Sequence, residues 1–108
     1  MNNIEFRAWN SQINKIIYLD PYQWSLTAIK SSPDWIVMMW TGLLDKHHKK
    51  IFEGDIITYG GKRNFVVIFH KGYFCYKSGE NEYHILDETQ VEVIGNIYEN
   101  PELLKEEL

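Results

Sequence analysis

Short apolar stretches separated by glycine-rich and polar turns run through the sequence, and they constrain the fold more than any other feature. Period-two alternation or short apolar runs predict strands at 4–9, 15–19, 24–29, 35–40, 63–70, 73–77, 83–86 and 91–94, and a further strand that begins after Gly54 with the pair Ile56-Ile57. Turn signals such as Gly60-Gly61 and Lys71-Gly72 fall between them. Many short strands at this spacing indicate a small β-barrel or sandwich.

Two of these strands read as buried, because their apolar residues run without interruption. These are Trp35–Trp40 and Arg63–His70, and the second is expected to be buried on both faces. Between them, Gly54 predicts a sharp bend with positive φ, which glycine adopts without steric cost.

Only the end of the chain has helical signals. Asn100 is a good N-cap, Pro101 suits the first helical position, and Glu102 complements the helix dipole. The segment 101–108 is too short to be stable alone, so we expect it to dock through its leucines.

Length and the single cysteine limit the possible settings. The 108 residues correspond to one domain, 1–108. The first ten residues have no signal-peptide pattern, and the longest apolar run is too short to cross a membrane. Cys75 has no partner for an intramolecular disulfide, and its aromatic neighbours favour a buried structural thiol over a reactive one. A cytoplasmic protein is therefore expected.

Charge is unevenly distributed along the chain. The formal net charge is −4, but residues 1–79 hold ten Lys/Arg against six Asp/Glu, and residues 80–108 hold one Lys against nine Asp/Glu. These groups can be solvated faces, or opposite patches that meet between copies and assemble an oligomer. A net acidic chain is a poor general nucleic-acid binder.

Four blocks of residues resemble the YopX family of phage and prophage proteins. They are Phe6–Trp9, Thr41–Leu43 with Asp45-Lys46, Ile51–Ile56, and Val93–Leu104, in this order and spacing. The segment 21–33 is the least similar.

The resemblance implies a mainly β fold, a small SH3-like β-barrel elaborated by extra hairpins and ending in a short helix. It implies no established activity and supplies no catalytic residues. Where family members often have an Asn-Gly-type turn, this chain has His47-His48, so a tight two-residue turn is not expected there.

Possible catalytic and metal-binding groups are few. Asp45 with His47 and His48 could hold a metal, but adjacent histidines on a loop do not readily point the same way. Glu53 and Asp55 could serve acid–base chemistry, or Asp55 could accept backbone N–H bonds in a turn while Glu53 is exposed. His70 and His84 fall on strands without a companion motif. We therefore assign no catalytic, cofactor-binding or metal-binding residue, and we expect no enzyme.

Aromatic residues make up 15% of the chain, with tryptophans at 9, 24, 35 and 40. They can fill a core, anchor a protein interface or stack bases. The sequence favours a non-enzymatic protein-interaction or self-assembling module, whose partner is a host protein, a phage protein or another copy of itself. The alternative is a small nucleic-acid-binding barrel with phosphate contacts from Lys46, Lys49, Lys50, Lys62 and Arg63.

Overall fold

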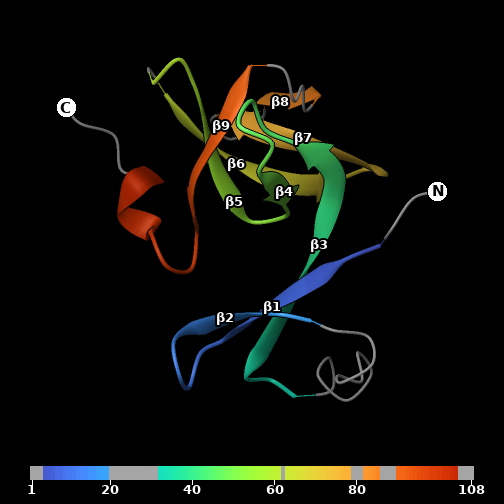
Figure 1. Cartoon of the computed structure of the whole chain (residues 1–108), viewed down its shortest axis with the longest axis vertical. Coiled ribbons are helices and arrows are strands. Elements are labelled where there is room, and N and C mark those ends of the chain that lie inside the picture. The colour runs from blue at the N-terminus through green and yellow to red at the C-terminus, as the bar shows by residue number, and fades with distance from the viewer. Residues whose placement is uncertain (1–3, 20–31, 62, 79–81, 86–89, 105–108) are drawn as a thin grey trace.

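A computed structural model describes residues 4–19, 32–61, 63–78, 82–85 and 90–104. Within these residues the protein is mainly β, as predicted (Figure 1). The strands are β1 (Phe6–Asn10), β2 (Lys15–Tyr18), β3 (Trp35–Leu44), β4 (Lys50–Phe52), β5 (Asp55–Tyr59), β6 (Asn64–His70), β7 (Tyr73–Ser78), β8 (Glu82–Ile85) and β9 (Val91–Asn96). The predicted strand at 24–29 lies outside the described residues.

The strands form two antiparallel sheets. The first has the order β2-β1-β3-β4 and the second the order β8-β7-β6-β5-β9. The long strand β3 extends from the β1–β2 hairpin to the region of the larger sheet (Figure 1). Its first half pairs with β1 on one side and its second half with β4 on the other. The SH3-like barrel stays a prediction.

Local turn chemistry explains the hairpins. In the β1–β2 turn, Asn10 Oδ1 accepts hydrogen bonds from the backbone N–H groups of Gln12 (2.8 Å) and Ile13 (3.2 Å). Between β6 and β7, Lys71 and Gly72 have φ values of 51° and 92°. Two successive positive φ values are typical of the tight turns whose twist matches that of antiparallel strands.

The core lies between the larger sheet and β4. Its fully or nearly buried side chains come from β4, β5, β6 and β9: Ile51, Ile57, Val67, Val91 and Val93. Partly buried aromatic residues surround them, with Tyr59, Phe65 and Tyr76 in mutual ring contact. Cys75 is fully buried, as expected.

The predicted burial of two strands is wrong in part. β6 is not buried on both faces, because Phe69 is 50% exposed, and in β3 Ile36 is 41% exposed. Both side chains lie beyond the tip of the β4–β5 hairpin, where no described strand covers them.

The C-terminal block ends in one 3-10 turn, Pro101–Leu104, and residues 105–108 lie outside the described residues. Pro101 takes the first helical position as predicted. Asn100 takes the predicted N-cap position, because its C=O accepts the N–H of Leu103 (3.0 Å), while its side-chain Oδ1 accepts from Asn96 N (3.2 Å) on β9. Asn64 Nδ2 of β6 donates to Leu103 O (2.7 Å), which ties the turn to the larger sheet. In the described part of the chain, no helix has the length and hydropathy needed to cross a membrane.

Candidate functional site

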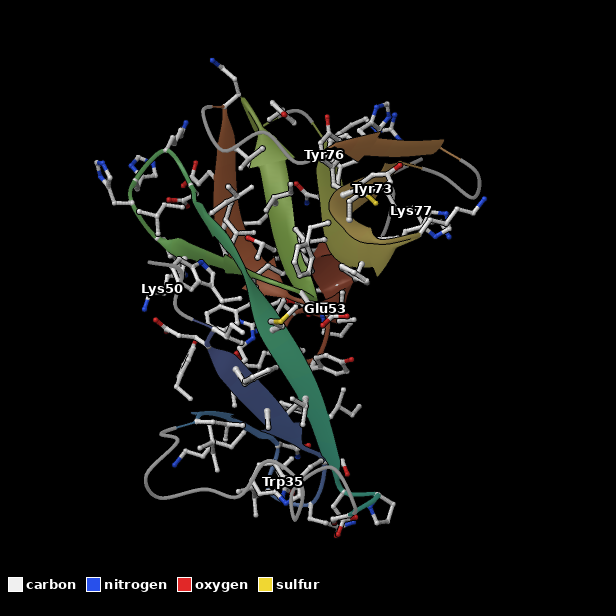
Figure 2. The ribbon with its side chains drawn as sticks, turned by 90° about the vertical axis from the view of Figure 1, so that its right-hand side faces the viewer. Trp35, Lys50, Glu53, Tyr73, Tyr76 and Lys77 are labelled. Carbon is white, nitrogen blue, oxygen red and sulfur yellow. The ribbon has the colours of Figure 1, made fainter. Side chains whose placement is uncertain are left out.

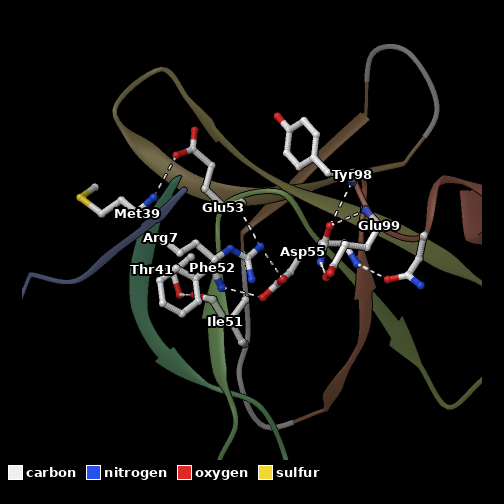
Figure 3. Close-up of polar contacts among 11 residues, drawn as sticks. Arg7, Met39, Thr41, Ile51, Phe52, Glu53, Asp55, Tyr98 and Glu99 are labelled. Carbon is white, nitrogen blue, oxygen red and sulfur yellow. Dashed lines mark hydrogen bonds and ion pairs between the residues drawn. The ribbon is translucent and has the colours of Figure 1, made fainter. Parts of the chain in front are cut away.

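A buried ion pair connects the two sheets (Figure 3). Arg7 of β1 places Nη2 2.8 Å from Oδ1 of Asp55 on β5, and the two side chains are only 4% and 3% exposed. The same Nη2 also donates to Glu53 O (3.3 Å), and the guanidinium lies 4.7 Å from the ring centroid of Phe52. Arg7 Nε is buried with no hydrogen-bond partner in the described part of the chain.

The second carboxylate oxygen of Asp55 organises the turn before it. Asp55 Oδ2 accepts the backbone N–H of Phe52 (2.7 Å), so the turn role considered for this carboxylate is confirmed. Burial raises the pKa of Asp55, while Arg7 and the Phe52 N–H oppose that shift. The group therefore serves as an internal connection between sheets, and its neighbours are backbone and guanidinium.

The turn at Glu53 and Gly54 bridges two strands of different sheets. Glu53 N donates to Met39 O of β3 (2.9 Å), and Gly54 N donates to Val67 O of β6 (2.8 Å). Gly54 has φ +87°, as the sequence predicted, and a Cβ there would lie 3.0 Å from Met38 Sδ. The Glu53 side chain also accepts from Met39 N (3.3 Å), so it is partly buried against β3 (Figure 3), and the expectation that it is exposed is wrong.

The block Val93–Leu104 packs onto the junction between the two sheets, which is formed by Arg7, Asp55 and the turn at Glu53 and Gly54. Ile97 N donates to Gly54 O (3.0 Å), and the ring of Tyr98 stacks on Trp9 of β1 at 5.7 Å between centroids. Burial and the nearby Glu53 carboxylate raise the pKa of the Tyr98 hydroxyl, and Arg7 opposes them. The Phe6–Trp9, Ile51–Ile56 and Val93–Leu104 blocks therefore meet at one place.

The loop that suggested a metal site is organised by Asp45. Its Oδ1 accepts from His47 N (2.8 Å) and Lys49 N (2.9 Å), and its Oδ2 accepts from Val93 N (2.9 Å). Burial alone would raise the pKa of Asp45, but these three backbone donors lower it. Both loop histidines are exposed, and the described residues contain no group of three His, Cys, Asp or Glu side chains placed to hold a metal ion.

Three of the basic residues considered for phosphate contacts lie beside a carboxylate or an aromatic ring. Lys50 Nζ lies 2.7 Å from Glu5, and Lys46 Nζ lies 3.8 Å from Glu92. The guanidinium of Arg63 lies over Phe65, on β6. Lys49 lines a groove near the ion pair, and Lys62 lies outside the described residues.

Two grooves flank the junction. The polar groove has a volume of about 610 Å³, and its lining includes Arg7, Asp55, Lys49, Asn96 and Asn100. The apolar groove has a volume of about 190 Å³ and lies beyond the hairpin tip. Apart from Glu53, Gly54 and Tyr98, its lining is aliphatic or phenylalanine: Ile36, Val37, Met38, Val66, Val67, Ile68, Phe69 and Ile97.

Sequence reasoning missed the residues that define this second groove. Ile36 and Phe69 sit in apolar runs that indicate a core, and nothing in the runs marks which end loses its cover. The only local signal is that Phe69 directly precedes the polar turn His70-Lys71. Arg7 was noticed only as part of a block, because its partner lies 48 residues away.

Comparisons with known proteins support the fold and show the family. Protein EF1440 from Enterococcus faecalis, known from a crystal structure, is similar with a TM-score of 0.73 and 22% identity, over 97% of this chain and 100% of that chain. No curated protein matches the sequence. A family model described as YopX protein matches residues 26–105, which is most of the chain, although the Phe6–Trp9 block precedes the matched range. The chain therefore belongs to the YopX family.

Proposed function

We propose that this protein is a non-enzymatic interaction module, encoded by a phage or prophage, that binds another protein or further copies of itself in the bacterial cytoplasm. The observation that carries the proposal is the apolar groove between β3 and β6. Its rim holds two large apolar side chains, Ile36 and Phe69, that are 41% and 50% exposed.

The positions of these side chains support an interior face that none of the described residues covers. Side chains two apart on a strand share a face. Ile36 therefore shares its face with Met38, which is 2% exposed, and Phe69 shares its face with Val67, which is fully buried. Both exposed residues thus belong to inward faces. An exposed apolar surface of this kind is typical of protein-binding sites.

The basic residues give weaker support to nucleic-acid binding. Lys46 and Lys50 each face a carboxylate, which reduces the positive potential that a phosphate backbone would meet. The interaction module is therefore the function that we put forward.

Size-exclusion chromatography with light scattering, over a range of salt and protein concentrations, tests self-association. The variants Ile36→Asp and Phe69→Asp place a charge in the groove, and Ile13→Asp is the matched control. Ile13 is 58% exposed in the β1–β2 turn and does not line the groove. We expect self-association, or retention of a host protein on the immobilised chain, to be lost in the first two variants only. A chain that is monomeric throughout and retains no protein in a groove-dependent way would overturn the proposal.

A further inference from the structure

The apolar groove continues a slot that the β4–β5 hairpin already occupies in part. The tip of the hairpin forms hydrogen bonds to the strands on both sides of the slot. Glu53 N donates to Met39 O of β3 (2.9 Å), and Gly54 N donates to Val67 O of β6 (2.8 Å). Figure 2 shows Glu53 beside the middle of β3. Beyond this tip, the first half of β3 and the end of β6 line the groove together.

The β3 wall has a free backbone edge at Val37. Trp40 N donates to Glu5 O across the β1–β3 ladder. In an antiparallel ladder, alternate residues bond the same neighbour, so Met38 and Ile36 also face β1. Met39 and Val37 then face the slot. Glu53 bonds Met39, whereas Val37 N–H and C=O have no partner within the described residues.

The β6 wall has a matching free edge at Phe69. Val67 O faces the slot, because it accepts the bond from Gly54 N. Alternation places Phe69 N–H and C=O on the same side, one step farther along the strand. β5 pairs with β6 only up to Val66, so in the described part of the chain no strand reaches Phe69 from that side.

We propose that the groove binds an extended segment of a partner protein, by β-strand addition beyond the hairpin tip. This inference rests on the proposed function and specifies which part of a partner protein the groove binds. Glu53 and Gly54 form backbone hydrogen bonds to β3 and β6, and the segment forms the same kind of bonds to Val37 of β3 and Phe69 of β6. These residues lie two strand residues, or about 6.6 Å, beyond the hairpin tip.

The lining determines the chemistry of that segment. Apolar side chains at alternate positions fit between Ile36 and Phe69, since a strand directs every second side chain to the same side. Glu53 is the one charged residue among those described in the lining, so a lysine or arginine in the segment complements it. A polar or acidic segment would leave both rims exposed.

Fluorescence anisotropy with labelled heptapeptides tests this inference on the intact chain. In the probe peptides, valine or phenylalanine alternates with lysine, and matched peptides carry N-methyl groups on alternate amides. We expect the unmodified peptides to bind with a dissociation constant on the order of micromolar. Binding should weaken about tenfold or more on N-methylation, and likewise in Ile36→Asp and Phe69→Asp but not in Ile13→Asp.

The outcomes separate specific from nonspecific binding. The aspartate variants make an acidic chain more acidic, so nonspecific attraction of lysine peptides would strengthen in them, and that result overturns the inference. Binding that survives N-methylation also overturns strand addition. If no peptide binds while the two groove variants still abolish self-association, strand addition is wrong and a folded surface of a second copy is the occupant. Should those variants change neither peptide binding, nor self-association, nor the retention of a host protein, the proposed function fails as well.

Discussion

Replacing Arg7 with methionine should destabilise the protein far more than removing an ordinary surface cation. At 2.8 Å, the attraction between Arg7 and Asp55 is about 6 kcal/mol for an effective dielectric constant of about 20. Desolvation of both groups offsets much of this gain. Removing the cation alone leaves the Asp55 charge buried with one remaining donor, the Phe52 N–H. Breaking a buried pair in this way costs about 3–5 kcal/mol.

A loss of that size is a large part of the stability of a small domain, which is about 5–15 kcal/mol in total. Urea unfolding followed by circular dichroism measures it, with Lys50→Met as the matched control. Lys50 also pairs with a carboxylate at 2.7 Å and also lies over an aromatic ring, but it is 45% exposed. Exposed pairs contribute about 0–1 kcal/mol, so the control should unfold near the wild-type midpoint.

The double variant Arg7→Met with Asp55→Asn completes the test. Asparagine keeps an acceptor for the Phe52 N–H but removes the charge, so the double variant should regain a large part of the stability lost in Arg7→Met. An Arg7→Met cost below about 1 kcal/mol, equal to that of Lys50→Met, would refute the view that this pair connects the sheets. So would a double variant whose cost is the plain sum of the two single costs.

Three further predictions concern Asp45, Gly95 and Cys75. Asp45→Asn should lower the free energy of unfolding by about 1–3 kcal/mol at neutral pH. The pKa of Asp45 in the folded protein lies below its ordinary value of 3.8, so its stabilisation is complete above pH 3.8 and disappears as the pH falls through the folded pKa. Urea unfolding of the wild-type protein and the variant, from neutral pH downward, should show the difference between their free energies of unfolding becoming smaller. A difference that stays constant would contradict this. Gly95→Ala should destabilise the protein by about 1–3 kcal/mol, because its Cβ would lie 2.6 Å from Asn100 Oδ1, and adding Asn100→Ala should relieve the clash; thermal unfolding of both variants checks this. The Cys75 thiol is fully buried, and burial raises its pKa. A disulfide reagent should therefore react with it only as fast as the chain opens, and denaturant should accelerate the reaction. Immediate reaction in the native protein would contradict this.

Strand and turn positions were largely predictable because their causes are local. Gly54 lies between two acidic residues and just before the β-branched pair Ile56-Ile57, which indicates a bend, and it has the expected positive φ. The two-residue reversal at Lys71-Gly72 is likewise encoded in those residues. The β-strand pattern between these turns follows from side-chain alternation.

Burial and long-range pairing were not predictable, because they depend on where sheets end. The run Phe65–Phe69 has the same composition throughout, yet Val67 is fully buried and Phe69 is half exposed. The difference arises because the β4–β5 hairpin stops at Gly54, and nothing within β6 encodes that. The partnership of Arg7 with Asp55 is also a property of the assembled sheets.

The family blocks and the groove differ in what they do for the molecule. Arg7, Gly54 and Tyr98 belong to blocks that carry the family resemblance, and each contacts the junction between the sheets. Ile36 and Phe69 lie outside those blocks, on strand ends that the junction holds apart. The junction can therefore maintain the slot while the side chains at its rim vary, and variation there would change which segment binds without changing the fold. On this reasoning, exchanging Ile36 and Phe69 for other apolar residues should alter peptide preference and leave the free energy of unfolding within about 0.5 kcal/mol of the wild-type value, as urea unfolding would measure.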